Sequence, residues 1–129
     1  MSYAVLKAMP VALILALMSF SVRAEVCDSM DNMMMSYAAF NRAANATEAS
    51  KALTQMRAAA VEAKAGIPMH LEDEPQNSPK RQLYQQEMDK LIIQIDKTKA
   101  LAAKGDMVQA KAEGKKLMQL RNEGHKLFR

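Results

Sequence analysis

Residues 120–129 read LRNEGHKLFR and carry His125, one of two histidines in the chain. Steps of three or four residues place His125 on a row made of Met107, Ala110, Gly114, Leu117, Arg121, His125 and Phe128. This spacing predicts the inward face of a helix. An imidazole on such a face needs a partner, because an unpaired buried polar group costs about 1–3 kcal/mol. The ordinary partner is a hydrogen bond within the core, and the remaining sequence suggests another.

Residues 1–24 have the features of a signal peptide. Lys7 gives a positively charged start, residues 11–22 are mostly apolar, and Val22-Arg23-Ala24 ends in a small residue that signal peptidase accepts. The apolar run is short for a membrane span, so an uncleaved anchor is the less favoured alternative. The sequence therefore predicts a cleaved signal peptide over residues 1–24, one domain over residues 25–129, and export to a bacterial periplasm.

Cys27 is the only cysteine, so no intramolecular disulfide can form. Because Val26 precedes it rather than a small residue, we expect no lipidation and interpret Cys27 as an incidental thiol or a point of dimerisation. Beyond residue 24 the chain holds 16 basic and 14 acidic residues, spread along its length, which gives no support for nucleic-acid binding. Alanine, leucine, methionine, lysine, glutamine and glutamate dominate the composition, which favours helices.

Residues 25–65 predict two helices joined by a short link. In residues 25–42 apolar side chains recur at steps of four and three, at Val26, Met30, Met33, Tyr37 and Phe40. Asn45 then caps a second helix, with Glu48 three residues later as in a capping box. That helix runs to about residue 65 and turns these side chains inward: Ala49, Ala52, Leu53, Met56, Ala59, Ala60 and Ala63.

Residues 66–77 (GIPMHLEDEPQN) form the one long connection, because two prolines and an acidic cluster fit no helix. The third helix begins at Ser78-Pro79, with Ser78 as its N-cap and Pro79 as its first residue. A third apolar row follows, made of Tyr84, Met88, Leu91, Ile95, Thr98 and Leu101. Gly105 ends the third helix, and Asp106 caps a fourth helix that reaches the C-terminus.

Four such helices and no strand pattern predict an all-α fold, an antiparallel up-down-up-down four-helix bundle. The first helix begins at the end of the bundle where the fourth finishes. Met30 lies about one turn into the first helix and His125 about one turn from the end of the fourth, both on inward faces. Their side chains are therefore expected to converge, with residues 66–77 available as a lid.

A thioether opposite an imidazole is a poor pair for proton transfer, but Met/His axial ligation is used by haems that transfer electrons. With both axial positions filled, a substrate has no place to bind the iron. Spacing alone also allows the ordinary interpretation, because methionine rows usually pack a core. Four of the nine methionines beyond residue 24 fall in residues 30–35, and most of these are assigned to packing or to the surface.

Several segments closely resemble the soluble periplasmic cytochromes b562. They are ALTQMRAAAVEAKA (residues 52–65), LED (71–73), SP (78–79), QID (94–96) and RNEGHKLFR (121–129). The resemblance covers residues 25–129 without insertions or deletions. It implies a four-helix bundle that binds one haem b per chain and transfers single electrons.

Carried over residue by residue, the resemblance implies His125 and Met30 as the axial iron ligands. A second register would use Met33, since Asp31-Asn32-Met33 also looks like the family's acidic-Asn-Met start, but it requires a deletion of three residues. Related c-type bundles, the cytochromes c-prime, attach haem through Cys-x-x-Cys-His, whereas residues 121–125 read RNEGH. The haem is therefore expected to be haem b, bound without a covalent link.

Arg121, one turn before His125, is expected to reach a haem propionate or to close the pocket, with an exposed salt bridge as the ordinary alternative. The candidates for the pocket wall, each equally well explained as core, are Leu117, Met33, Met56, Tyr84 and Met88. The family's aromatic residues before the axial histidine and on the third helix appear here as Gly124 and Met88. Because Gly114 and Gly124 each cost a helix up to about 1 kcal/mol relative to alanine, we expect a frayed C-terminus and weaker haem retention.

The sequence thus predicts an electron carrier and not an enzyme, because it shows no nucleophile with a nearby base, no paired catalytic carboxylates and no phosphate-binding loop. The expected partners are unidentified redox proteins, and the mature chain is expected to be a monomer that binds no nucleic acid and does not insert into the membrane. The alternative is a haem-free, Met-rich protein that acts as a small chaperone-like module or binds Cu(I) through Met30, Met33, Met34 and Met35. His70, expected to be exposed, is a substitute ligand if Met30 fails.

Overall fold

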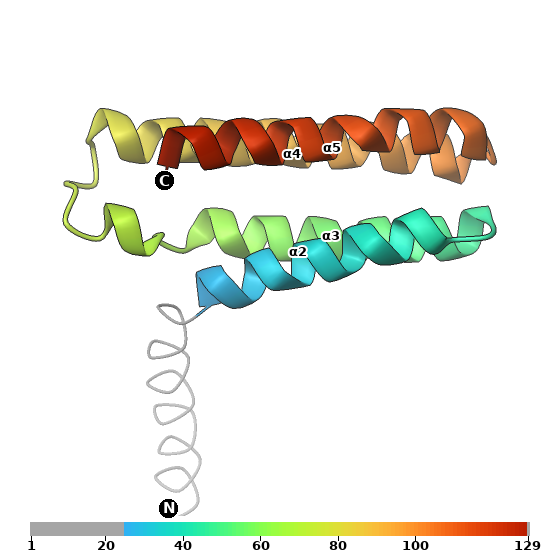
Figure 1. The fold of residues 1–129 in the computed structure, drawn as a ribbon, viewed down its shortest axis with the longest axis horizontal. Helices are drawn as coiled ribbons and strands as arrows, with labels where there is room; N and C mark the ends of the chain where they lie inside the picture. The colour runs from blue at the N-terminus through green and yellow to red at the C-terminus, as the bar shows by residue number, and fades with distance from the viewer. Residues whose placement is uncertain (1–24, 129) are drawn as a thin grey trace, which may run out of the picture.

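The structure, a computed structural model, describes residues 25–128, so the predicted signal peptide lies outside the described residues. Its helices are α2 (Glu25–Arg42), α3 (Ala46–Ala65), the short 3₁₀ helix η1 (Met69–Leu71), α4 (Pro79–Ala103) and α5 (Met107–Phe128). The described residues contain no strand. Successive long helices run antiparallel along one axis (Figure 1), which confirms the predicted all-α bundle. None of the helices within residues 25–128 is long and apolar enough to cross a membrane.

The capping residues set the starts of α3 and α4 as predicted. The Asn45 side chain accepts a hydrogen bond from the Glu48 amide at 2.9 Å, and the Glu48 carboxylate accepts one from the Ala44 amide at 2.9 Å. At the start of α4 the Ser78 hydroxyl accepts a hydrogen bond from the Arg81 amide at 3.2 Å. These caps satisfy amides that have no partner inside their own helix.

The tight turn between α4 and α5 depends on Gly105 and Asp106. Gly105 has a φ of 83°, a left-handed conformation that glycine adopts without steric cost. The Asp106 side chain accepts a hydrogen bond from the Gln109 amide at 3.1 Å and caps α5. The two helices therefore lie side by side and antiparallel.

The connection over residues 66–77 is not free of helix, so that part of the prediction was wrong. After Pro68 the chain makes one 3₁₀ turn, in which the Leu71 amide donates a hydrogen bond to the Pro68 carbonyl at 2.9 Å. The Leu71 side chain is only 3% exposed and belongs to the hydrophobic core. Burial of this one apolar residue draws the connection onto the bundle, which a count of prolines and acidic residues does not reveal.

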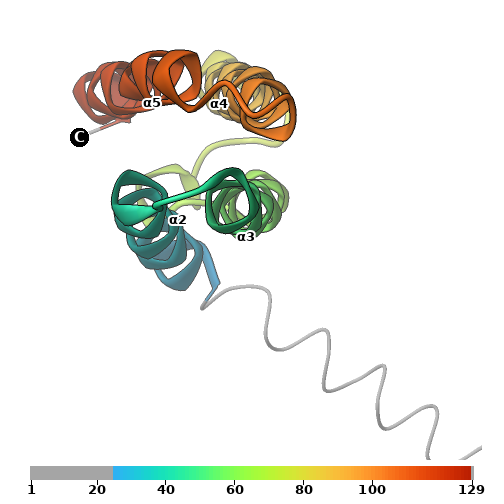
Figure 2. The ribbon, with the colours of Figure 1, turned by 90° about the vertical axis from the view of Figure 1, so that its right-hand side faces the viewer.

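The bundle consists of two layers, α2 with α3 and α4 with α5 (Figure 2). The closely packed pairs of helices are α2–α3, α3–α4 and α4–α5. All seven side chains of α3 that were predicted to face inward are buried: Ala49, Ala52, Leu53, Met56, Ala59, Ala60 and Ala63. Because five of them are alanines, α3 can approach its neighbours α2 and α4 closely.

At the end of the bundle away from residues 66–77, α5 lies directly against α2. Phe40 is fully buried, and a Cβ added to Gly114 would lie 2.5 Å from Cε2 of its ring. The Lys111 ammonium donates hydrogen bonds to the carbonyls of Phe40 and Asn41 and lies 4.8 Å from the centroid of the Phe40 ring. Gly114 is therefore required for packing, although from sequence it appeared only as a cost to the helix.

Replacing Gly114 with alanine is expected to lower the free energy of unfolding by about 1–3 kcal/mol, because the new Cβ would overlap the fully buried Phe40 ring. The matched change in the same helix, Gly124→Ala, is expected to raise it by up to about 1 kcal/mol. A Cβ at Gly124 would meet no atom within 4 Å. Urea denaturation followed by circular dichroism measures the free energy of unfolding of both variants. If the two substitutions changed it equally, contact with Phe40 would not be what requires glycine at position 114.

Candidate functional site

A cavity of about 520 Å³ lies at the opposite end of the bundle, between the N-terminal half of α2 and the C-terminal half of α5. Its back wall comes from α3 and α4, and residues 67–70 and Glu72 of the long connection close one side. Its volume falls within the range of roughly 300–1,000 Å³ that is usual for cofactor and ligand sites. Most of its lining side chains are apolar, so it suits a large apolar ligand.

α2 and α5 contact each other at the end of the bundle away from the cavity. The pair α2–α5 is not among the closely packed helix pairs of the described residues. Near the cavity, α5 passes through Gly124, which has no side chain and whose surroundings are open. α5 nevertheless continues as regular helix to Phe128, so the expected fraying is not seen in its described residues.

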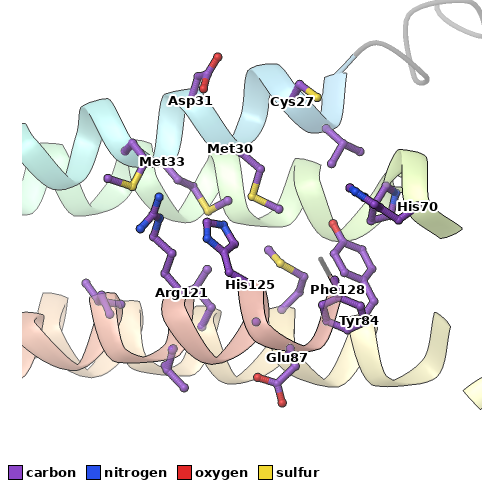
Figure 3. A pocket seen from close by; sticks show the side chains of 18 of the residues that line it. Cys27, Met30, Asp31, Met33, His70, Tyr84, Glu87, Arg121, His125 and Phe128 are labelled. Atoms are coloured by element: carbon purple, nitrogen blue, oxygen red, sulfur yellow. The ribbon is translucent and has the colours of Figure 1, made fainter. Parts of the chain in front are cut away.

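Met30 and His125 line this cavity from different helices. Figure 3 shows the Met30 side chain descending from α2 and the His125 imidazole rising from α5 into the space between the two helices. Both residues are half-buried, and Met30 packs against the edge of the core. A thioether and an imidazole thus face one apolar space from opposite sides.

Met33, the alternative to Met30, lies one turn further along α2. It also lines the cavity, but it is only 8% exposed and belongs to the core cluster. The remaining wall candidates from the sequence all line the cavity as well: Met56, Tyr84, Met88 and Leu117. Met35 is exposed and does not line it, so the four methionines of residues 30–35 do not converge on one point.

Arg121 is half-buried and lines the cavity one turn before His125. Figure 3 shows its side chain extending from α5 toward α2. Arg121 forms no salt bridge with any of the described residues. The guanidinium is therefore positioned at the cavity with its hydrogen-bonding capacity available to an anionic group.

Tyr84 and Phe128 form an aromatic wall at one end of the cavity. Their rings pack edge to face, with centroids 5.7 Å apart and an interplanar angle of 86°. The Tyr84 hydroxyl donates a buried hydrogen bond to the Ala63 carbonyl, which joins α4 to α3. Desolvation by burial raises the pKa of Tyr84 to about 12.

Among the further residues that line the cavity are Cys27 and Met34 of α2, and Met69 and His70 of the connection that was predicted as a lid. Cys27 and Met34 stand three residues before and four residues after Met30 on α2, a helical spacing that would have found them. Met69 and His70 are both exposed, as expected for His70, and η1 brings them to the cavity. Within residues 25–128 no three His, Cys, Asp or Glu side chains gather in a way that could hold a metal ion.

The pKa of Tyr84 predicts a specific pH dependence of stability. A raised pKa in the folded state means that the neutral phenol contributes stability below the unfolded pKa of 10.0, and that this stability is lost as pH rises toward about 12. The free energy of unfolding of the wild type is therefore expected to fall relative to Tyr84→Phe by up to about 2–3 kcal/mol over this range. Urea denaturation at several pH values measures the difference, and a constant difference would contradict a desolvated Tyr84.

The fold and the site together define a small four-helix bundle with a cofactor-sized apolar cavity between its first and last helices. A family model described as cytochrome b562 matches residues 25–129. Of the relatives from Yersinia pestis, "Probable soluble cytochrome b562 2" is 33% identical over 124 residues, which cover 96% of this chain and 97% of that protein. "Probable soluble cytochrome b562 1" is 30% identical over 115 residues, which cover 89% and 91%. The chain belongs to the cytochrome b562 family, which supports a b-type haem cytochrome that carries electrons.

Proposed function

We propose that the protein carries single electrons by means of one non-covalent haem b held between Met30 and His125. The observation that carries this proposal is that these two side chains, from the two terminal helices, line one apolar cavity in a member of the cytochrome b562 family. Met30 and His125 would hold the haem, which would supply one-electron chemistry when bound. An electron carrier therefore suits the site better than an enzyme.

The residues present fit a haem on the chemistry of the donor set and on the shape of the site. The Met30 thioether and the His125 imidazole are ligands that iron takes in electron-transfer haems. The buried side chains of Met56, Met88 and Leu117 give the cavity an apolar wall. The chain has a single cysteine, Cys27, which lies on α2 and not beside His125. The site therefore lacks the pair of cysteines that would attach a haem covalently next to the histidine.

Met30 is favoured over Met33 because the two side chains differ in burial. Met33 is largely enclosed by other core side chains, so moving its sulfur to a ligand would disturb the packing of the core. Met30 stands at the edge of the core, where its sulfur reaches the cavity without such a rearrangement. The thioether of Met33 then contributes to the wall.

The ligand assignment is tested with Met30→Leu, Met33→Leu and His125→Ala, since leucine keeps the approximate volume of methionine and removes only the sulfur. Each protein is titrated with haem, and its absorption spectrum is recorded oxidised and reduced. We expect a sharp low-spin reduced spectrum for the wild type and Met33→Leu, and its loss in Met30→Leu and His125→Ala. If Met33→Leu lost this spectrum and Met30→Leu kept it, Met33 and not Met30 would be the ligand.

If the wild type instead gives a broad spectrum with loosely held haem, the electron-carrier proposal fails. The second candidate, a Cu(I) protein, would then be tested by titration with Cu(I) against the same two methionine variants. The exposed position of Met35, outside the cavity, favours haem over Cu(I), because the methionines of residues 30–35 do not point to a common site.

Arg121 is proposed to bind a haem propionate. Arg121→Gln is expected to raise the rate of haem loss roughly tenfold, since a hydrogen bond to a charged group contributes about 1.5–3 kcal/mol, and Arg121→Lys to raise it less. Lys115→Gln is the matched control, because it removes one positive charge from the exposed face of α5. Equal rates for Arg121→Gln and Lys115→Gln, measured by transfer of haem to excess apomyoglobin, would show that only net charge matters.

We further propose that residues 1–24 are a signal peptide and that the mature protein is a periplasmic monomer whose partners are other redox proteins. The positively charged start, the apolar run and the small residue at position 24 support this location. Expression of the full chain in a bacterium is expected to yield a periplasmic protein whose N-terminal residue is Glu25, as determined by mass spectrometry. Retention of residues 1–24 in a membrane fraction would contradict it.

A further inference from the structure

The cavity is unusually rich in thioethers, and these differ in their access to solvent. Seven of the nine methionines within residues 25–128 line it. Met33, Met56 and Met88 are buried, with 8%, 3% and 5% of their surface exposed. Met34 on α2 and Met69 on η1 are 37% and 74% exposed. The thioethers therefore form both the interior of the cavity and part of its rim.

Exposure decides which thioethers an oxidant reaches. In the reaction of a thioether with a hydroperoxide, a sulfur lone pair takes the terminal oxygen, an S–O bond forms and the O–O bond breaks. The sulfur loses two electrons, and the hydroperoxide gains them and leaves as an alcohol or as water. The product, methionine sulfoxide, is polar and can be reduced back to methionine by methionine sulfoxide reductases.

We propose that Met34 and Met69 form a reversible oxidation site at the rim of the cavity that controls how tightly the protein retains haem. This inference rests on the proposed function. Reduced, the two side chains present apolar surface to an apolar ligand. Oxidised, each presents an S=O group that binds water, so the rim no longer shields the ligand from solvent.

Two neighbouring methionines separate this proposal from general oxidative damage. Met35 is 69% exposed on the same helix but does not line the cavity, so its oxidation is expected to leave haem binding unchanged. Met30 lines the cavity but is half-buried, so it is expected to react more slowly than Met34 and Met69. Haem retention is therefore expected to fall when Met34 and Met69 are oxidised, and not when an exposed methionine outside the cavity is oxidised.

The test compares three proteins: a Cys27→Ser reference, the reference with Met34→Leu and Met69→Leu, and the reference with Met35→Leu. The cysteine is replaced because Cys27 is an exposed thiol that lines the cavity and also reacts with peroxides. Each haem-free protein is treated with tert-butyl hydroperoxide, and peptide mass spectrometry identifies the oxidised residues. Haem is then added, and its rate of loss to excess apomyoglobin is measured before and after treatment with sulfoxide reductases and a thiol reductant.

Oxidation is expected to speed haem loss about fivefold in the reference and in Met35→Leu, as for the loss of a modest apolar contact. In the variant without Met34 and Met69, oxidation is expected to change the rate of haem loss less than twofold. Treatment with the reductases is expected to return the rate of the oxidised reference to its value before oxidation. Equal sensitivity of the rim variant and Met35→Leu, or no recovery once the sulfoxides are reduced, would overturn the proposal. Failure of the unoxidised wild type to bind haem would instead refute the proposed function, and this inference with it.

Discussion

The contact between the Phe40 ring and the backbone at Gly114 sets the geometry on which the rest of the molecule depends. It brings α5 against α2 at one end of the bundle, where Lys111 adds hydrogen bonds to the end of α2. Both helices are long and regular, and their other ends lie on either side of the cavity. The space left between those ends is the cavity. Met30 and His125 line this cavity, at the end of the bundle away from the Phe40 contact.

The cavity end is built from side chains that tolerate a ligand. Thioethers are flexible and polarizable, so they adapt to a planar apolar group better than branched side chains do. The polar groups are few and have separate roles: the Tyr84 phenol is engaged by the Ala63 carbonyl, whereas Arg121 remains available at the cavity. A ligand that fills the space adds apolar contacts that the folded chain alone lacks, so its binding also stabilises the fold.

The fold could be predicted from sequence because the capping residues and the apolar periodicity agree with each other. Asn45, Ser78 and Asp106 start their helices as expected, and all the predicted inward side chains of α3 are buried. The role of Gly114 was not predicted because it depends on the Phe40 ring of another helix. The turn of η1 was not predicted because it depends on the burial of Leu71 in the core. Sequence placed Met30, Arg121 and His125 at one end of the bundle, and the spacing from Met30 also places Met34 there. The 3₁₀ turn of η1, which was not predicted, brings Met69 to the same space.

The links between α3 and α4 have a consequence for how a cofactor enters and leaves. Salt bridges join Arg57 to Asp96 and Lys64 to Asp89, and a buried hydrogen bond joins Tyr84 to Ala63, so polar contacts as well as packing hold these two helices together. The end of α5 rests on them through an aromatic contact. Opening of that last turn alone would expose the cavity at a fraction of the free energy of global unfolding. The cofactor would then enter and leave by local opening, while the α3–α4 hairpin stays folded. The amide hydrogens of that hairpin would be the last to exchange with solvent.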